Sequence, residues 1–404
     1  MRRNRRRFYR FLLFCAVAAG IMALSRAIPA WLESKAPVAP APPPEKKKTE
    51  ITLAAAGDLL MHLPVVYSDY DAEKKSFDFG PVFAPIEPYL NSADYTVANL
   101  ETRLAGPERG YHGYPLFNTP AGLAWHMKKI GVDLLSTANN HSLDMGWDGI
   151  VTTLDNLDAA GLAHVGTYRN EAERAKPFIV DVKGVKLAFL NHTAITNGLP
   201  LPAGRDYAVN LLDREKVITE AQAARKAGAD LVVAIIHMGV EYRRFPEESQ
   251  RELTTGLCVY GVDVVINSHP HVVQPIEKVS VERGGVKRDC VAAHSLGNFV
   301  SAQDWRYSDS GIILYLYIEK DTSGAVIRDV RYLPVWMELS KKNGHERFRV
   351  LPVHPALPAN TDIPLTPEDN ARMAQVWEEL KAHLEKPEQG ILPYLYYASK
   401  AATF

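Results

Sequence analysis

From residue 50 onward, short runs of β-branched and other apolar residues alternate with longer segments that have the periodicity of helices. Such apolar runs are typical of buried strands, which we expect at 51–58, 95–101, 132–141, 185–193, 229–239, 262–271 and 290–300. Helices are expected between them, at about 81–90, 121–130, 146–160, 213–227 and 246–260, several with Gly near the C-terminal end. This alternation predicts an α/β fold.

Almost every one of these apolar runs ends abruptly in Asp, Glu, Asn or His. Ligands of open α/β sheets bind outside the carboxyl ends of the strands. We therefore expect polar side chains from several strand ends to converge on one site.

The pattern changes after about residue 311. Alternating strands at 311–320 and 326–339 predict a hairpin that adds sheet without adding polar strand ends. From about Thr366 the chain predicts a helix with apolar positions at Met373, Val376, Leu380 and Leu384. We identify no chemistry in this tail.

The N-terminal pattern is that of an export signal. Residues 1–10 are strongly basic, and an uncharged apolar run follows at 11–24. The run is short for a membrane span, but 27–32 adds apolar residues, so we favour a retained anchor over secretion after signal cleavage. The main domain is then outside the cytoplasm. The expected organisation is a signal or anchor segment at 1–32, a Pro- and Lys-rich stalk at 33–49, the main domain at 50–340 and a C-terminal extension at 341–404.

Composition narrows the function classes. The 404 residues carry a formal net charge of -1 and 47% hydrophobic residues, so the chain can bury a full core and shows no bulk bias toward nucleic acid. Cys258 and Cys290 are the only cysteines beyond the apolar segment, too few for a disulfide framework. We expect both to be buried and inert, and a single bridge between them stays open.

Three histidines follow buried strands. His269 and His271 are two residues apart after an apolar strand, so both rings can project to one side, as metal ligands often do. His237 ends another apolar strand. Alone, a solvated pair and a satisfied core histidine explain these residues as well as a metal does, but together they favour a metal.

Oxygen ligands follow the other strands, namely Asp58, Glu101 and Asn140. Carboxylates combined with imidazoles favour Mn²⁺, Fe²⁺ or Zn²⁺ over Ca²⁺. Six ligands exceed one tetrahedral shell. They suit two divalent metal ions that share a carboxylate, an arrangement that stabilises both the attacking and the leaving oxygen of a phosphoryl displacement.

These motifs, taken in order, resemble the CapA family. They are Gly57-Asp58, Asn99-Leu100-Glu101, Asn139-Asn140-His141 with Asp144, His237-Met238-Gly239 with Glu241, Ser268-His269-Pro270-His271, and Ser295 to Phe299. Proteins of this family are associated with poly-γ-glutamate capsule synthesis, and their domain is similar to the calcineurin-like metallophosphoesterases. The resemblance spans about residues 51–301. It implies a four-layer α-β-β-α sandwich of the metallophosphoesterase type, here with a C-terminal β-hairpin and a helical tail.

The resemblance also implies roles for single residues. Asp58 matches the metal ligand of the first strand, Glu101 stands where the phosphoesterases use a bridging Asp, and Asn140 matches the amide ligand of the second metal. His237, His269 and His271 complete the ligand set. His141 matches a proton donor to the leaving group, and Asp144 could hold its ring by a hydrogen bond.

Two motifs depart from the phosphoesterase pattern. The family's Asp-x-His is replaced by Asp58 followed by Leu59-Leu60-Met61-His62, so His62 is not assigned as a metal ligand. Asn139 stands where the phosphoesterases have Gly, and the acid after the histidine is displaced to Asp144. The fold is therefore expected to carry over better than the reaction.

Loops after the strand ends supply candidate substrate-binding residues, namely Arg103, Asn118, Glu241, Arg243 and Asn298. A cation beside Glu241 suits an anionic substrate, and the loop 103–119, with Tyr114 and Phe117, suits a substrate-lining segment. A solvated charged loop, a surface Ω-loop and a tight turn around Asn298 explain the same residues without a ligand.

These features support an extracytoplasmic CapA-like protein of poly-γ-glutamate or related capsule polymer synthesis, with phosphoester-type hydrolysis at a dinuclear metal site. The expected partners are an anionic polymer or phosphoester substrate and a membrane capsule-synthesis complex, with no nucleic acid. The alternative is a non-catalytic, polymer-binding accessory subunit of that complex. A periplasmic solute-binding protein ranks last, because it leaves the histidines unexplained.

Overall fold

The computed structural model describes residues 48–342, 345–355, 357 and 364–394. The predicted signal or anchor segment and nearly all of the predicted stalk lie outside these described residues and stay predictions. No helix in the described part of the chain is both long and apolar enough to cross a membrane.

The larger sheet has nine strands, seven of them in the order β16-β15-β14-β1-β4-β5-β6, with β13 added beside β1 and β17 beside β15. Its strands are β1 (Thr49–Leu59), β4 (Tyr95–Leu100), β5 (Leu134–Ser136), β6 (Ala163–Val165), β13 (Asn298–Val300), β14 (Ser310–Asp321), β15 (Gly324–Lys342), β16 (His345–Pro352) and β17 (Ile391–Pro393). β1, β4, β5 and β6 run parallel, and the hairpin of β14 and β15 joins the antiparallel side of β1. The predicted hairpin is therefore confirmed.

The smaller sheet has six strands in the order β11-β12-β10-β9-β8-β7. They are β7 (Phe178–Val182), β8 (Val185–Thr193), β9 (Leu231–His237), β10 (Val264–Ser268), β11 (Val273–Arg283) and β12 (Val286–Leu296). Its four inner strands run parallel, and β7 and β11 are antiparallel edges. A separate ribbon pairs β2 (Tyr70–Asp71) with β3 (Ser76–Phe77).

The described helices are α2 (Leu63–Val66), α3 (Gly80–Phe83), α4 (Glu87–Leu90), α5 (Gly122–Lys129), α6 (Gly146–Ala159), α7 (Glu171–Ala175), α8 (Arg214–Lys226), α9 (Glu248–Val259) and α10 (Pro367–Leu384), with 3₁₀ turns at Pro107–Arg109 and Pro387–Gln389. The single helix predicted at 81–90 is wrong: Pro85 lies between α3 and α4, and a proline inside a helix removes a hydrogen-bond donor and clashes with the preceding turn. The C-terminal helix is confirmed. Thr366 caps α10 through a reciprocal capping box with Asp369.

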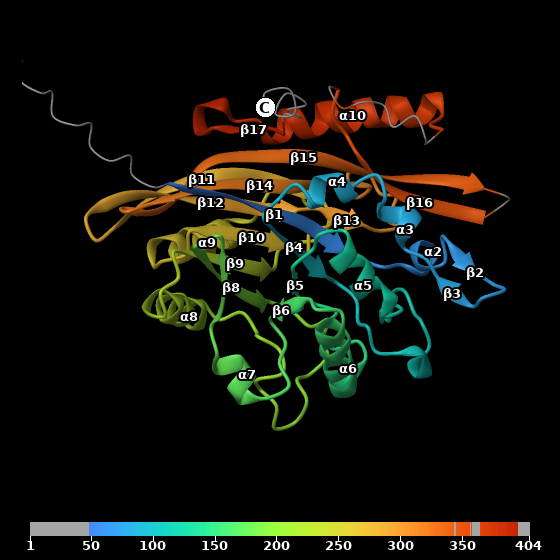
Figure 1. Ribbon diagram of the computed structural model, residues 1–404, viewed down its shortest axis with the longest axis horizontal. Coiled ribbons are helices and arrows are strands. Elements are labelled where there is room, and N and C mark those ends of the chain that lie inside the picture. The colour runs from blue at the N-terminus through green and yellow to red at the C-terminus, as the bar shows by residue number, and fades with distance from the viewer. Residues whose placement is uncertain (1–47, 343–344, 356, 358–363, 395–404) are drawn as a thin grey trace, which may run out of the picture. The chain divides into compact units, whose positions relative to one another are not determined.

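Alternating strand residues separate the layers. Leu53 of the larger sheet and Val233 of the smaller sheet belong to one core between the two sheets. Ala54, on the opposite face of β1, belongs to a second core with α3, α5 and α6, whereas Val232 belongs to a third core with α8 and α9. Figure 1 shows α5 and α6 apart from α8 and α9. This packing confirms the predicted four-layer α-β-β-α sandwich.

The C-terminal residues complete the same sheet. The expected boundary at residue 340 falls inside β15, and both β16 and β17 pair with that strand. α10 packs against β11 and β15, and the sheet-to-sheet core includes Val376, Leu380 and Leu384 (Figure 1).

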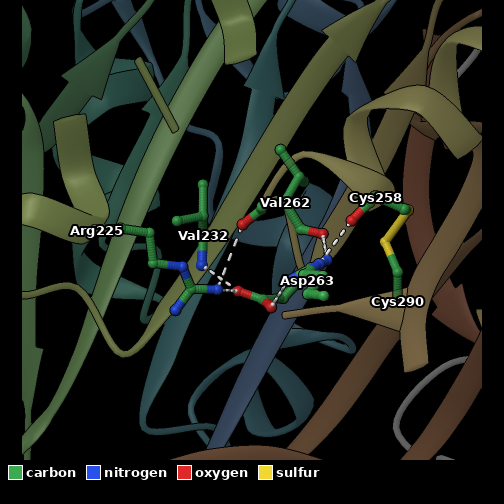
Figure 2. Close-up of a disulfide and its surroundings, with 8 residues drawn as sticks. Arg225, Val232, Cys258, Val262, Asp263 and Cys290 are labelled. Atoms are coloured by element: carbon green, nitrogen blue, oxygen red, sulfur yellow. Dashed lines mark hydrogen bonds and ion pairs between the residues drawn. A yellow bond between two sulfur atoms is a disulfide. The ribbon is translucent and has the colours of Figure 1, made fainter. Parts of the chain in front are cut away.

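The two cysteines are buried, as expected, and bonded to each other. The Cys258–Cys290 disulfide joins α9 to β12, with the two Cα atoms 5.8 Å apart (Figure 2). Beside it, Asp263 accepts hydrogen bonds from Arg225 and from the backbone N–H of Val232. The bridge therefore fastens a helix to the smaller sheet next to a partly buried ion pair.

Candidate metal centre and cleft

The carboxyl ends of four strands meet at one place. β1 and β4 of the larger sheet bring Asp58 and Glu101, and β9 and β10 of the smaller sheet bring His237 and the loop of His269 and His271. All five residues are almost fully buried. The centre therefore lies where the two sheets come together, as the polar strand ends predict.

Two overlapping groups of these residues could each hold a metal ion. In one, ligand atoms of Glu101, His237 and His269 lie within 4.8 Å of one another, and in the other, those of Asp58, Glu101 and His271 do so. Glu101 belongs to both groups. The sixth predicted ligand, Asn140, places its Oδ1 2.8 Å from Nε2 of His237. All six predicted ligands therefore lie in one cluster.

The carboxylates of this cluster are only partly satisfied. Nδ2 of Asn99 donates to Asp58 Oδ1 at 2.8 Å and reaches Glu101 Oε2 at 3.4 Å. Asp58 Oδ2 and Glu101 Oε1 are buried and have no hydrogen-bond partner among the described residues. Burial, and next the neighbouring Asp58, raise the pKa of Glu101 well above its usual 4.5. Orphaned buried acceptors of this kind point to a missing cation.

Two imidazoles of the cluster, those of His237 and His269, have lowered pKa values. Burial, followed by the neighbouring histidines, lowers the pKa of His237 well below 6.5. The same two causes lower the pKa of His269 to about 4. A neutral ring keeps a lone pair on one nitrogen, which is the form that binds metals.

Hydrogen bonds determine which nitrogen of His271 carries the proton. Nδ2 of Asn298 donates to the backbone carbonyl of Ser308 at 2.9 Å, so Oδ1 of this amide must be an acceptor. That Oδ1 lies 3.1 Å from Nδ1 of His271, which therefore donates. The lone pair is then on Nε2, 3.8 Å from Glu101 Oε1.

The backbone around the centre is tightly constrained. His269 and His271 adopt positive φ values of 103° and 57°, which are rare for residues other than Gly and concentrate at functional sites. Next to Asp58, a Cβ on Gly57 would lie 1.9 Å from the carbonyl oxygen of Gly297. Gly57 therefore allows β1 to approach the segment that leads into β13.

This donor set fits divalent ions of the Mn²⁺, Fe²⁺ or Zn²⁺ kind, because it combines carboxylates, one amide oxygen and three imidazoles. Asp58, Glu101 and His271 would hold one ion. Glu101, Asn140, His237 and His269 would hold the other. The unpartnered buried oxygens of Asp58 and Glu101 fit this assignment.

A second buried group adjoins the centre. Nδ1 of His141 lies 2.7 Å from Asp144 Oδ2, which also accepts the backbone N–H of Phe117 at 2.7 Å. The predicted contact between His141 and Asp144 is therefore present. The guanidinium of Arg103 is fully buried and donates to the carbonyl of Leu100 at 2.9 Å. Burial lowers its pKa to about 10, and the charges of Asp144 and Glu101 oppose that shift.

A cleft of about 800 Å³ opens beside the metal ligands. Asn140, His141 and His271 lie in its lining, which also includes Tyr242 and the segment 114–117. With Nδ1 of His141 used by Asp144, Nε2 is the nitrogen that can meet a bound molecule. The arrangement can therefore combine metal binding with proton delivery at one cleft.

The five predicted substrate-binding residues have different positions. Glu241 lines the cleft, but Arg103 and Asn118 are fully buried and outside its lining, and both use their side chains to bind backbone groups of the loops. Arg243 lies 3.8 Å from Glu247 and is mostly exposed. Asn298 orients His271 instead of lining the cleft. Of the five, Glu241 is therefore the one that the structure places in the lining of the cleft.

Several residues of the site were not assigned from the sequence. Asn99 bonds both carboxylates, and its position two residues before Glu101 on β4 is the signal that could have revealed it. Ser268 lies 2.8 Å from Nδ1 of His237. His62 lines the cleft, and its Nδ1 accepts the backbone N–H of Ala302 at 3.4 Å; it belongs to neither of the two groups that could hold a metal.

Comparisons with known proteins agree with the motif order. Residues 52–303 match the family model described as bacterial capsule synthesis protein PGA_cap. The chain is 27% identical over 312 residues to the capsule biosynthesis protein CapA of Bacillus anthracis, covering 75% of this chain and 72% of that protein. It is 29% identical over 329 residues to the PGA biosynthesis protein CapA of Bacillus subtilis (strain 168), covering 78% and 76%.

Among solved structures, the NAD nucleotidase NadN of Haemophilus influenzae gives a TM-score of 0.46 at 13% identity. The match covers 84% of this chain and 64% of the nucleotidase, so this chain spans less than two thirds of that protein. The fold assignment rests on the strand order and core packing of this chain itself.

We expect Gly57→Ala to lower the free energy of unfolding by about 1–3 kcal/mol, because the added methyl group must displace the backbone at Gly297. The midpoint of urea unfolding, compared between wild type and the variant, measures this loss of stability. Gly122→Ala is the matched control, since its Cβ would meet only Phe79 Cε2 at 3.9 Å and should not destabilise the protein. Equal midpoints for wild type and Gly57→Ala would refute the tight approach.

We expect metal-free Glu101→Gln to be more stable than metal-free wild type at neutral pH, by about 1 kcal/mol. The folded-state pKa of Glu101 is raised, so wild type loses stability relative to the variant as pH rises from the usual carboxyl value of 4.5 toward the folded pKa. Below pH 4.5 the two should converge. Unfolding measured across this pH range tests the sign, with the exposed Glu282→Gln as control.

Saturating Mn²⁺ should then reverse the order. At a concentration of 100 times the dissociation constant, it should stabilise wild type by about 2.7 kcal/mol and the variant by less. If Glu101→Gln gained as much from Mn²⁺ as wild type, Glu101 would not be a shared ligand.

Proposed function

Since this chain belongs to the bacterial capsule synthesis protein PGA_cap family, we propose that it serves capsule polymer synthesis outside the cytoplasm as a metal-dependent phosphoester hydrolase. The observation that carries the proposal is the position of Glu101. Its carboxylate belongs to both groups that could hold a metal, and its Oε1 is buried without a hydrogen-bond partner among the described residues. A carboxylate shared between two cations is the arrangement used in two-metal hydrolysis of phosphoesters.

Two divalent ions held there would supply Lewis acidity toward the phosphoryl oxygens and make water a better nucleophile. The residues of the chain supply the rest. Asn99 and Ser268 orient Asp58 and His237, and Asn298 holds Nε2 of His271 free. These contacts keep the ligands in place before substrate arrives.

His141 is the proposed proton donor. Asp144 holds its Nδ1, so the ring can deliver a proton from Nε2 to the leaving oxygen as the bond between phosphorus and that oxygen breaks and a bond from phosphorus to the oxygen of water forms. Phe117 contacts the His141 ring edge-to-face with centroids 4.7 Å apart, which restricts its rotation. Proton delivery matters most when the leaving oxygen is strongly basic.

An extracytoplasmic location is part of the proposal. The basic and apolar pattern of residues 1–24 is that of an export signal, and disulfides such as Cys258–Cys290 persist in oxidising compartments outside the cytoplasm. An N-terminal anchor would keep the domain beside a membrane complex that synthesises the polymer. Secretion after cleavage is the alternative.

We expect full-length protein with Mn²⁺ to hydrolyse both 4-nitrophenyl phosphate and glycerol 3-phosphate, and chelation to abolish both activities. His141→Ala should lower turnover of glycerol 3-phosphate by about 100-fold or more, because its leaving alkoxide needs a proton. The loss for 4-nitrophenyl phosphate should be much smaller, since nitrophenolate leaves without one. Release of phosphate measures both rates.

His164→Ala is the control, because His164 contacts Asp158 at 3.2 Å and lies outside the lining of the cleft, so this variant should retain full activity. Equal losses for the two substrates would exclude His141 as the acid. Absence of hydrolysis with any divalent metal, in a folded protein that binds capsule polymer, would favour the non-catalytic accessory subunit.

A further inference from the structure

Beyond the metal ligands, the cleft has an uneven chemistry. Of the described residues in its lining, none is Lys or Arg, whereas Glu241 and Asp304 contribute carboxylates and Asn197 and Gln303 contribute amides. The remaining lining is largely aromatic and aliphatic. Outside the metal centre, the described lining therefore offers aromatic rings, carboxylates and amides but no Lys or Arg.

Three aromatic rings of the lining are exposed. Tyr114 is 79% exposed, Trp305 62% and Tyr242 43%. Apolar surface left open to water around a cleft usually marks a binding site. The rings of Trp305 and Tyr242 have centroids 6.3 Å apart, and those of Tyr242 and His271 are 6.1 Å apart. An aromatic path therefore leads from the entrance of the cleft to a metal ligand.

The ring of Tyr242 is held in place. Its residue adopts a positive φ of 63°, and its backbone N–H donates to the carbonyl of Pro270 at 2.8 Å. Its hydroxyl accepts from Nε2 of Gln303 at 3.1 Å, and Gln303 Oε1 accepts from Nδ2 of Asn298 at 2.9 Å. Asn298 also binds His271, so one hydrogen-bonded chain connects the aromatic wall with the metal centre.

Three arginines closely follow lining residues in the sequence, and each of them contacts a residue outside the lining. Arg243 lies 3.8 Å from Glu247, Arg244 stacks on the ring of Tyr307, and Arg306 contacts both Tyr307 and Glu379. Among the described lining residues, Glu241 and Asp304 would disfavour a polyanion by like-charge repulsion, and no Lys or Arg of that lining would compensate them. The part of the substrate that lies beyond the scissile phosphate should be uncharged.

We propose that this part is a sugar ring, so that the substrate is a phosphoester of a neutral sugar rather than of a polyanionic chain. This inference rests on the proposed function. The apolar face of a sugar ring packs on Trp305 and Tyr242, and its hydroxyl groups donate to the carboxylates of Glu241 and Asp304. A flat nucleobase would use the rings but would make less use of the carboxylates.

The experiment compares glucose 1-phosphate, a nucleoside 5′-monophosphate and glycerol 3-phosphate, each with Mn²⁺-loaded full-length wild type and Trp305→Ala. Trp305→Ala should raise KM for the sugar phosphate about tenfold with little change in kcat, and should leave glycerol 3-phosphate unaffected. Trp125→Ala is the matched control, because Trp125 is 45% exposed on α5 and outside the lining of the cleft. Poly-γ-glutamate added as a competitor should inhibit only weakly.

The inference is overturned by any of three outcomes. These are equal loss for the sugar phosphate and glycerol 3-phosphate, higher kcat/KM for the nucleotide than for the sugar phosphate, and strong competition by poly-γ-glutamate. If wild type hydrolyses none of the three compounds, the proposed function fails, and calorimetric binding of glucose 1-phosphate to wild type and Trp305→Ala decides the ring site by itself. Weaker binding to Trp305→Ala than to Trp125→Ala would support the sugar site, and equal binding would overturn it.

Discussion

Three buried carboxylates, those of Asp58, Glu101 and Asp144, lie close together where the two sheets meet, with the single buried guanidinium of Arg103 beside them. Three carboxyl groups lie beside the guanidinium of Arg103, and the raised pKa of Glu101 indicates that ionising this excess of acidic groups is unfavourable in an environment of low dielectric constant. The neutral imidazoles of His237 and His269 do not reduce this excess. Divalent cations do, and the rest of the site is built around that requirement: the amides of Asn99 and Asn298 and the hydroxyl of Ser268 orient the ligands, and Gly57 lets the strands approach closely.

Much of this arrangement follows from local pattern. Continuous apolar runs along β1, β9 and β10 predict strands buried on both faces. The polar residue that ends such a run lies at the carboxyl end of the strand, where ligands of α/β sheets bind. The pattern alone therefore predicts that Asp58, Glu101 and His237 lie in one cluster. The four-layer class, in contrast, is implied by the resemblance of the motif order to a family, because the strand pattern allows that class without singling it out.

Other features depend on contacts between distant segments and are not visible in local pattern. Arg103 and Asn118 have the polarity of substrate-binding residues, but the loop that carries them folds back so that their side chains bind backbone carbonyls in the interior. The close approach of Gly57 to Gly297 joins positions 240 residues apart in the chain, and the proton position on His271 depends on the carbonyl of Ser308. The contact between the rings of Trp305 and Tyr242 likewise joins segments that are distant in the chain.

The chain belongs to a capsule synthesis family, but the described lining of its cleft contains no Lys or Arg. These two observations conflict if the polyanionic polymer itself is assumed to be the substrate. They agree if the protein, as proposed, acts on a phosphoester at another step of polymer assembly, with the phosphate at the metal centre and an uncharged group on the aromatic wall. The metal pair is the element on which this account depends. Anomalous X-ray scattering from crystals soaked in Mn²⁺ tests it directly: the account predicts two peaks, both within coordination distance of the Glu101 carboxylate, whereas a single peak, or two peaks that do not share Glu101, would contradict it.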